Sequence, residues 1–404
     1  MSQVKEFYQK HRNAAALLFL SLLLVFVTAC GSNSGNSSGA DSNKPIKIGV
    51  LVSMSGPFSS GGEGIKKGIE LYLKMNGNKI NNRNVETVYE DDENNPQVAL
   101  RKFNKLVDSD HIDVLLGGIS TTVVSAISDA VNQNKIPFII VNAGSNEMSW
   151  SKKSDYIYRA SFSNYQYGDA AGTLIAQNIA KKAYVLMNDY PAGHEQADAF
   201  EKAFKAAGGT DLKMAYPPLG ASDFATYITE ITNYKPDVVY SAFGGSDGVR
   251  FALQYASFGL KGKIPLVSQV ADDQITSPEI KNALDNEYAF TSYYSQIDNE
   301  ANKSFVKAYQ EQYNEAPANF MELGYESAQI IGKSIEEAGS TKPEDLIKKL
   351  MNVSIASPRG NHVMDPNTHN QVIDFYLLQF KLQGEKVNYD LVKTQKEVKM
   401  PEKP

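Results

Sequence analysis

The sequence predicts an α/β protein with two Rossmann-like lobes, in each of which helices flank a parallel sheet. Apolar runs of strand length alternate with segments of helical spacing from residue 45 onward, and this alternation restarts at residue 165. Continuous apolar strands that alternate with helices are typical of a parallel sheet covered on both faces. The 404 residues suffice for two or three domains. We therefore expect two lobes with a cleft at the carboxyl ends of their strands.

The first lobe begins with a strand, a turn and a helix. Ile65, Ile69, Tyr72 and Leu73 share one face of that helix, as in an amphipathic helix packed on a sheet. The predicted strands are 46–52, 85–90, 114–118 and 137–141, and the predicted helices are 65–75, 96–107 and 123–132.

The second lobe repeats the pattern. Residues 114–120 and 239–246 both run from an apolar strand through Gly-Gly and Ser into a helix, which favours two lobes built alike. Residues 372–382 alternate like a late antiparallel strand. The other predicted strands are 183–187, 238–243 and 265–270, and the predicted helices are 165–180, 195–207, 224–234, 248–258, 301–314, 323–338 and 343–351.

Composition excludes several classes of function. Cys30 is the single cysteine, so neither an internal disulfide nor a thiolate metal site can form. None of the five histidines forms an i,i+4 pair, so we expect no metal, and no nucleotide-binding motif points to a cofactor. The formal net charge of −6 argues against a nucleic-acid partner.

The N-terminus predicts export and membrane anchoring. Basic residues precede an apolar stretch at 14–27, so residues 1–29 are expected to be a signal peptide. Val27-Thr28-Ala29-Cys30 resembles a bacterial lipobox, which implies that Cys30 carries a lipid. Residues 30–44 would then be the lipidated cysteine and a flexible Gly/Ser/Asn tether. The expected location is the extracytoplasmic face of the cell membrane.

Small polar residues follow two neighbouring strands of the first lobe. Ser120 and Thr121 precede a helix, and Ala143-Gly144-Ser145 follows the next strand. Hydroxyls and free backbone N–H groups at a helix N-terminus can hold a carboxylate, although each segment alone is equally well explained as helix capping. Both loops would face one crevice, which favours ligand binding.

Two glycine patterns suggest other functions. Residues 244–248 match G-x-S-x-G, so a serine hydrolase using Ser246, with Asp272 and either His362 or His369, is an alternative. Residues 62–68 look like a dinucleotide fingerprint, but they have one residue too many and lie too far after the strand, so a loop entering a helix is expected.

A series of short motifs resembles one known family in order and spacing over roughly residues 45–380. These motifs are Ser55-Gly56-Pro57, Asp92…Pro96-Gln97-x-Ala99, Gly117-Gly118-x-Ser120-Thr121, Ile136-Pro137 leading to Ala143-Gly144-Ser145, Asp189-Tyr190-x-x-Gly193, Asp223-Phe224, Pro236-Asp237-Val238-Val239, and Gly259-Leu260 with Ile264-Pro265. Together they are similar to the branched-chain amino-acid-binding (leucine/isoleucine/valine-binding-like) substrate-binding proteins of ABC transporters.

The resemblance implies a type I periplasmic-binding-protein fold, whose lobes are joined by three crossover strands and close on a ligand. The crossings would lie near 161–165, 291–295 and 370–373. The first lobe would comprise 45–163 and 294–371, and the second 164–293 and 372–395. Residues 396–404 would be a tail.

The resemblance also implies a non-enzymatic function. The protein, expected to be a monomer, would capture a small polar molecule, with a branched-chain-type amino acid as first choice, and deliver it to an ABC permease. A ligand-sensing receptor subunit on the same fold is the alternative.

Site residues follow from the resemblance position by position. Ser120 and Thr121 would bind the ligand carboxylate, and the Ala143 carbonyl and Ser145 hydroxyl would bind its ammonium. The remaining implied residues are the aromatic Phe58 and Tyr190 and an acid from the second lobe, Asp272 or Asp247. The family's usual acid position, near residues 269–271, offers no acid. The ligand would not be a simple α-amino acid if neither aspartate reaches it.

Overall fold

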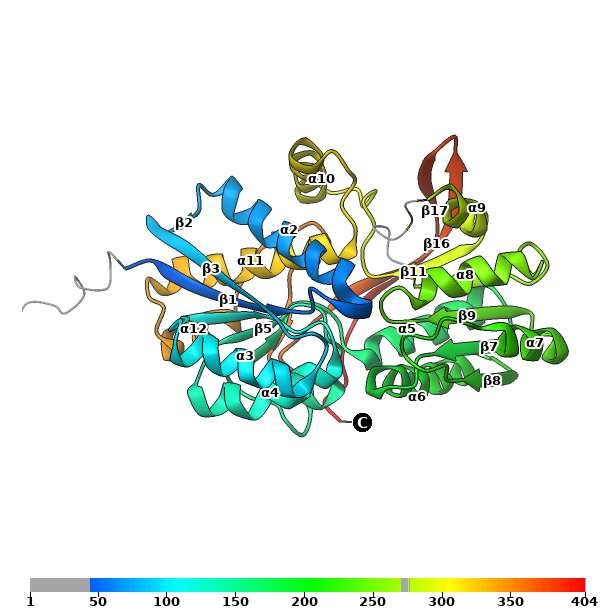
Figure 1. Ribbon diagram of the computed structural model, residues 1–404, viewed down its shortest axis with the longest axis horizontal. Coiled ribbons are helices and arrows are strands. Elements are labelled where there is room, and N and C mark those ends of the chain that lie inside the picture. The colour runs from blue at the N-terminus through cyan, green and yellow to red at the C-terminus, as the bar shows by residue number, and fades with distance from the viewer. Residues whose placement is uncertain (1–43, 270–274, 276, 404) are drawn as a thin grey trace, which may run out of the picture. The chain divides into compact units, whose positions relative to one another are not determined.

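The structure is a computed structural model that describes residues 44–269, 275 and 277–403. The predicted signal peptide, the tether with Cys30, and Asp272 lie outside the described residues. The described chain forms two large, mostly parallel sheets with helices on both faces of each, which confirms the predicted fold class (Figure 1). A separate two-stranded sheet joins β12 (Ala356–Ser357) and β13 (Gly360–Asn361). No helix in the described ranges is both long and apolar enough to cross a membrane.

The first sheet has a parallel centre and antiparallel edges. β1 pairs in parallel with β3 and β4, and the parallel order continues through β5 and β6. Its strands in spatial order are β14 (Met364–Asp365), β15 (Asn370–Gln371), β6 (Ile157–Arg159), β5 (Phe138–Ile140), β4 (Val114–Gly117), β1 (Ile46–Val52), β3 (Arg83–Asp91) and β2 (Lys79–Ile80).

Helices cover both faces of the first sheet because successive strand side chains point to opposite sides. Val50 and Val52 pack with α2 (Ser59–Met75), α11 (Asn319–Ala338) and α12 (Pro343–Leu350). Leu51 packs with α3 (Pro96–Asp108) and α4 (Thr121–Asn134). In Figure 1, α2 and α11 accordingly lie on the opposite side of β1 and β3 from α3 and α4. Short 3-10 turns, η1 (Gly56–Phe58) and η2 (Asn146–Ser149), complete the loops after β1 and β5.

The second sheet ends in a long antiparallel hairpin. β16 pairs antiparallel with both β11 and β17, as the alternation at 372–382 predicted. Its strands in spatial order are β17 (Lys386–Val398), β16 (Ile373–Gln383), β11 (Tyr288–Thr291), β10 (Leu266–Ser268), β9 (Val238–Ala242), β7 (Lys182–Met187) and β8 (Asp211–Ala215).

The second sheet is covered in the same way as the first. Val185 packs with α5 (Asn164–Asn178) and α6 (Pro191–Ala206). Tyr184 and Leu186 pack with α7 (Ala225–Tyr234), α8 (Asp247–Ser257) and α9 (Pro278–Leu284). Both sheets are therefore buried on two faces, which explains their nearly continuous apolar strands.

The chain passes between the two sheets more than once. It leaves the first sheet after β6 to form α5, returns after β11 to form α10 (Glu300–Tyr313), which contacts α2, and crosses again between β15 and β16. It then returns once more after β17. Trp150 Nε1 donates a hydrogen bond to the Pro401 carbonyl (2.7 Å), and Asn367 Nδ2 donates to Glu402 Oε1 (2.7 Å). Part of the segment predicted as a tail is thus β-strand, and the rest packs on the first lobe.

The glycine pattern at 62–68 lies inside α2. A Cβ at Gly62 would lie 2.1 Å from the Ser53 carbonyl oxygen, and one at Gly68 would lie 2.0 Å from that of Met321. These glycines therefore let α2 pack closely against the chain after β1 and against α11.

Candidate ligand-binding site

A cavity lies where the carboxyl ends of strands from both sheets meet. The volume in which the centre of a water molecule can lie is about 110 Å³. The first sheet contributes residues that follow β4 and β5, and the second contributes residues that follow β7, β9 and β10. Crevices at the carboxyl ends of parallel strands are the usual ligand sites of open α/β sheets.

The described part of the cavity wall is aromatic and uncharged. Its rings are Phe58, Phe162, Tyr167, Tyr190, Phe243, Phe290, Tyr293, Tyr294, Phe320 and Tyr389. Its polar side chains are Thr121, Asn142, Asn164, Gln196, Gln269, Thr291 and Asn319. No aspartate, glutamate, lysine or arginine occurs among the described lining residues. The wall therefore suits an apolar body with a few hydrogen-bonding groups.

The N-terminus of α4 forms one corner of the cavity. Ser120 caps the helix, since its Oγ accepts from the Val123 N–H (3.3 Å). Thr121, the first residue of the helix, lines the cavity, and its Oγ1 accepts from Asn164 Nδ2 (3.2 Å). First-turn N–H groups lack intrahelical acceptors and carry the positive end of the helix dipole. This corner therefore suits a carboxylate.

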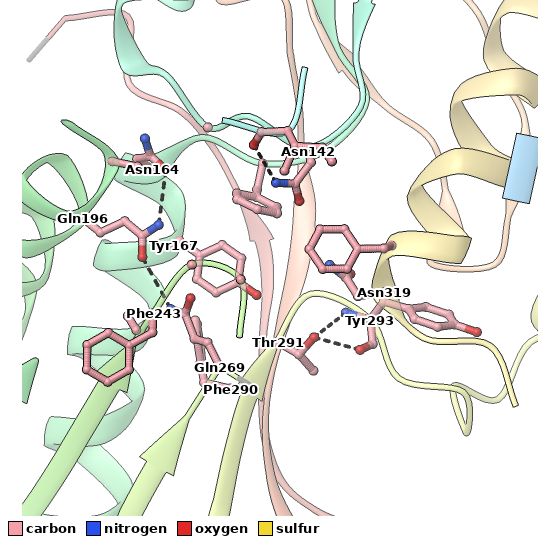
Figure 2. A pocket seen from close by; sticks show the side chains of 18 of the residues that line it. Asn142, Asn164, Tyr167, Gln196, Phe243, Gln269, Phe290, Thr291, Tyr293 and Asn319 are labelled. Atoms are coloured by element: carbon pink, nitrogen blue, oxygen red, sulfur yellow. Dashed lines mark hydrogen bonds between the residues drawn. The ribbon is translucent and has the colours of Figure 1, made fainter. Parts of the chain in front are cut away.

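A chain of side-chain amides runs along the wall from Gln269 through Gln196 to Asn164 (Figure 2). Gln269 Nε2 donates to Gln196 Oε1 (3.5 Å), and Gln196 Nε2 donates to Asn164 Oδ1 (3.2 Å). Asn164 then donates to Thr121 in the first lobe. The chain fixes the orientation of each amide, so the polar groups around the cavity are positioned before a ligand arrives.

The loop after β5 approaches α5 closely. The Asn164 N–H donates to the Gly144 carbonyl (2.7 Å), and a Cβ at Gly144 would lie 2.3 Å from Asn164 Oδ1. Only glycine fits there without displacing Asn164, which explains the glycine in the Ala143-Gly144-Ser145 motif.

Phe58 and Tyr190 line the cavity from opposite lobes. A Cβ at Gly244 would lie 3.0 Å from the Phe58 ring and 3.3 Å from the Tyr190 hydroxyl, so Gly244 makes room for both rings. Burial raises the pKa of Tyr190, and Glu195 and Asp247 add to this effect. Tyr190 therefore stays a neutral phenol and offers a ring and a hydroxyl to a ligand.

A buried arginine lies behind the loop after β5. Arg159, the last residue of β6, is 1% exposed. Its Nε donates to the Ala143 carbonyl (3.1 Å) and its Nη2 donates to the Ser145 carbonyl. Its Nη1 donates to Ser149 Oγ (3.0 Å) and Asn370 Oδ1 (2.5 Å). The guanidinium thus holds the carbonyls on both sides of Gly144, which lines the cavity.

Glu195 of α6 joins the two lobes near the same loop. Its Oε2 accepts from the Asn146 N–H (3.1 Å) and from Asn164 Nδ2 (2.7 Å). Burial raises its pKa, against the opposing effects of these hydrogen bonds and of Arg159. Sequence reasoning missed Arg159, Asn164, Glu195 and Gln196. Asn164 directly precedes the predicted helix 165–180, and Glu195 and Gln196 begin the predicted helix 195–207, but no local pattern marks any of the four as a site residue.

The structure brings three of the predicted site residues into the cavity wall, namely Phe58, Thr121 and Tyr190. Ser120, Ala143 and Ser145 lie beside lining residues but are not part of the wall. The buried carboxylate of Asp247 accepts hydrogen bonds from Asn188 Nδ2 (2.8 Å) and the Gly220 N–H (2.7 Å). Asp247 does not line the cavity, where the predicted ligand acid would have to be. That each of these residues binds ligand stays a prediction.

The described residues of the alternative hydrolase triad, Ser246, His362 and His369, each have other hydrogen-bond partners. Ser246 Oγ accepts from Arg250 Nη1 (2.7 Å). His362 Nδ1 lies 3.2 Å from Glu326 Oε1, and His369 Nδ1 contacts the carbonyl of Ser154 (2.8 Å). The glycines of the motif have a packing role instead, since a Cβ at Gly245 would lie 2.2 Å from the Pro57 carbonyl oxygen.

Comparison with known proteins identifies relatives over most of the chain. The sequence pattern of a family described as periplasmic binding protein matches residues 45–386 of this chain. Leu/Ile/Val-binding protein homolog 6 of Brucella melitensis is 26% identical over 341 residues, which cover 82% of this chain and 86% of the relative. These relatives are solute-binding proteins and not enzymes.

Two solved structures are similar along nearly their whole length. A solute-binding protein of an ABC transporter from R. palustris, in complex with benzoate, has 30% identity and a TM-score of 0.80, covering 86% of this chain and 96% of that one. Another, from Rhodopseudomonas palustris BisB5 in complex with 3,4-dihydroxy benzoic acid, has 26% identity and a TM-score of 0.83, covering 88% and 99%.

Proposed function

The chain belongs to the periplasmic binding protein family and is an ABC-transporter substrate-binding protein of the Leu/Ile/Val-binding type, and we propose that its ligand is a small carboxylic acid with an aromatic ring, of the benzoate class. The ligand lies between the lobes, with its carboxylate at the N-terminus of α4 beside Thr121 and its ring among the aromatic side chains. The loaded protein delivers it to a membrane permease.

The uncharged aromatic wall is the observation that supports this ligand class. Ten of the described lining residues carry aromatic rings and none carries a charge. Aromatic rings stack favourably on one another, and Thr121 with the first turn of α4 offers donors to one carboxylate. An α-amino acid would also bring an ammonium, and a buried charge without a partner is costly. Two similar proteins were solved with benzoate and with 3,4-dihydroxy benzoic acid.

A branched-chain amino acid is the second candidate, because the curated relatives are named Leu/Ile/Val-binding proteins. An acid in the second lobe would then have to balance the ammonium. Asp272 lies outside the described residues, and Asp247 is bound within its own lobe.

A thermal-shift screen of the purified protein tests the ligand class. The panel is benzoate, 4-hydroxybenzoate and 3,4-dihydroxybenzoate against leucine, isoleucine and valine. A ligand at 100 times its Kd stabilises the folded state by about 2.7 kcal/mol, which raises Tm. We expect shifts with the benzoates and none with the amino acids. Shifts with the amino acids alone would overturn the proposed ligand class.

We also propose that Cys30 anchors the protein by a lipid on the extracytoplasmic side. The supporting observations are the Val27-Thr28-Ala29-Cys30 sequence and the Gly/Ser/Asn-rich residues after it. Cells grown with a radiolabelled fatty acid should incorporate label into the wild-type protein and not into Cys30→Ala. The variant should appear in the soluble extracytoplasmic fraction, and label on Cys30→Ala would refute the anchor.

A further inference from the structure

Arg159 is a buried cation whose hydrogen-bond partners are all uncharged. Its guanidinium donates to two carbonyls, one hydroxyl and one side-chain amide oxygen. No carboxylate of the described residues forms an ion pair with it. Burial lowers its pKa to about 10, while Glu195 opposes the shift, so Arg159 stays protonated at neutral pH. A charge buried without a counterion is costly, which suggests that another group completes its environment.

The position of Arg159 relative to the cavity indicates which group that is. The two carbonyls that it holds, those of Ala143 and Ser145, flank Gly144 in the cavity wall. The Ala143 carbonyl is the atom that the family resemblance assigns to the ligand ammonium. A ligand ammonium bound there would share its acceptor with a guanidinium, and two like charges would be brought together in a dehydrated cleft.

The hydroxyl of Ser145 is a second, independent observation. Ser145 is fully buried, and its Oγ has no hydrogen-bond partner in the structure. A buried polar atom that lacks a partner calls for an explanation, and this one lies behind the lining residue Gly144, outside the cavity wall itself. Ser145 lies directly after Gly144, on the same loop that Arg159 holds.

We propose that Arg159 is a fixed internal cation that takes the place of the ligand's ammonium, so that the site selects carboxylic acids without an α-amino group and rejects amino acids. This proposal rests on the proposed function of the cavity and names the residue that sets the charge of its ligand. Arg159 acts through the loop 143–145 and is a positioning residue.

A matched pair of ligands tests the proposal on the wild-type protein. Leucine and 4-methylpentanoate share the carboxylate and the branched body and differ by the ammonium. In calorimetric titrations, with benzoate as reference, we expect 4-methylpentanoate to bind at least ten-fold more tightly than leucine. Equal or tighter binding of leucine would overturn the inference while leaving a solute-binding site intact. If none of the three binds, the proposed ligand class fails, and the inference fails with it.

A substitution at Glu195 distinguishes a site for a carboxylic acid without an ammonium from a site for an amino acid. Glu195→Gln keeps an oxygen that can accept from Asn146 and Asn164 but removes the negative charge near Arg159. If the positive charge of Arg159 favours an anionic ligand, this variant should bind benzoate two- to ten-fold more tightly. Weaker binding of benzoate would contradict the proposal, as would a loss of leucine binding in a protein whose wild type binds leucine.

Substitutions at Arg159 test whether its charge affects ligand affinity or whether the side chain only supports the structure. The measured quantity is the ratio of the affinities for benzoate and benzamide, which have the same ring and differ in charge. We expect Arg159→Gln to lower this ratio at least ten-fold and Arg159→Lys to retain most of it. An unchanged ratio in folded Arg159→Gln would refute the role. If that variant does not fold, the ligand pair and Glu195→Gln decide the question.

Discussion

Two arginines are buried near the crossing segments, and they differ in what balances them. Arg159 donates only to uncharged oxygens. The Arg359 side chain is 5% exposed and lies between two buried acids, with Nε 3.0 Å from Glu322 Oε2 and Nη2 2.9 Å from Glu326 Oε1. Arg359 forms ion pairs with two acids, whereas Arg159 donates only to uncharged groups among the described residues and has Glu195 as a nearby acid.

The difference separates a structural arginine from one that we assign to ligand selection. Arg359 Nη2 also donates to the Ala160 carbonyl (2.6 Å) and to Gln371 Oε1 (2.8 Å), which belong to two different crossing segments. Its cluster therefore ties both segments to α11. Arg159 hydrogen-bonds to the loop at the cavity wall, so its charge lies close to the place where we propose that the ligand binds.

Removing Arg359 should produce the largest loss of stability. Arg359→Met would leave the ionised Glu326 buried without its arginine partner, and breaking a buried ion pair costs about 3–5 kcal/mol. Arg159→Gln breaks no ion pair, only hydrogen bonds from a charged donor, and should cost about 1.5–3 kcal/mol. Urea unfolding monitored by circular dichroism measures both. A larger loss at Arg159 than at Arg359 would contradict the comparison.

The two acids beside Arg359 should respond differently to loss of their charge. Burial raises the pKa of Glu322 well above its ordinary value of 4.5. Burial alone would also raise that of Glu326, but Arg359 and His362 outweigh it and lower the pKa. Glu326→Gln should therefore cost about 1.5–3 kcal/mol at pH 7. Glu322→Gln mimics a protonated acid of nearly the same volume and should cost less than about 1.5 kcal/mol.

The pH dependence of stability follows from the directions of these two pKa shifts. Glu322, with its raised pKa, stabilises the fold below pH 4.5 and loses that contribution as the pH rises toward its folded value. Glu326, with its lowered pKa, contributes above pH 4.5 and loses the contribution in acid. Between pH 5 and 8, Glu322→Gln should thus flatten the decline in urea midpoint relative to wild type. An unchanged slope would show that Glu322 is ionised in the folded protein.

A smaller effect, on ligand affinity, is expected at the N-terminus of α4, where we propose that the ligand carboxylate binds. Thr121→Val keeps the shape of the side chain but removes the hydroxyl that accepts from Asn164 at the first turn of α4. The loss of about 1 kcal/mol should weaken benzoate binding roughly five-fold. Thr121→Ser, which keeps the hydroxyl, is the control. Equal affinities of wild type and Thr121→Val would place the carboxylate elsewhere.

The sequence predicts the fold better than it predicts the site. Apolar runs such as 46–52 identify the central strands, because strands buried on both faces must be apolar along their length. β6 was missed, since Ile157-Tyr158-Arg159 is short and ends on a charged residue. The burial of Arg159 depends on carbonyls 14 and 16 residues away in the chain, which no local pattern reveals.

The predicted site residues show the same limit. Thr121 could be predicted because a hydroxyl at the start of a helix that follows a strand has a local signature. Asn164 and Gln196 carry no such signature, since their roles arise from the approach of α5 and α6 to the first lobe. The G-x-S-x-G match at 244–248 was misleading, because glycines at close contacts and glycines at a nucleophile look alike in sequence.

Calorimetric titration of one protein preparation with 4-hydroxybenzoate and with leucine tests the central claim most directly. The uncharged aromatic wall and the internal cation Arg159 predict saturable one-to-one binding of 4-hydroxybenzoate and no measurable heat with leucine. Saturable binding of leucine together with no binding of 4-hydroxybenzoate would contradict the account.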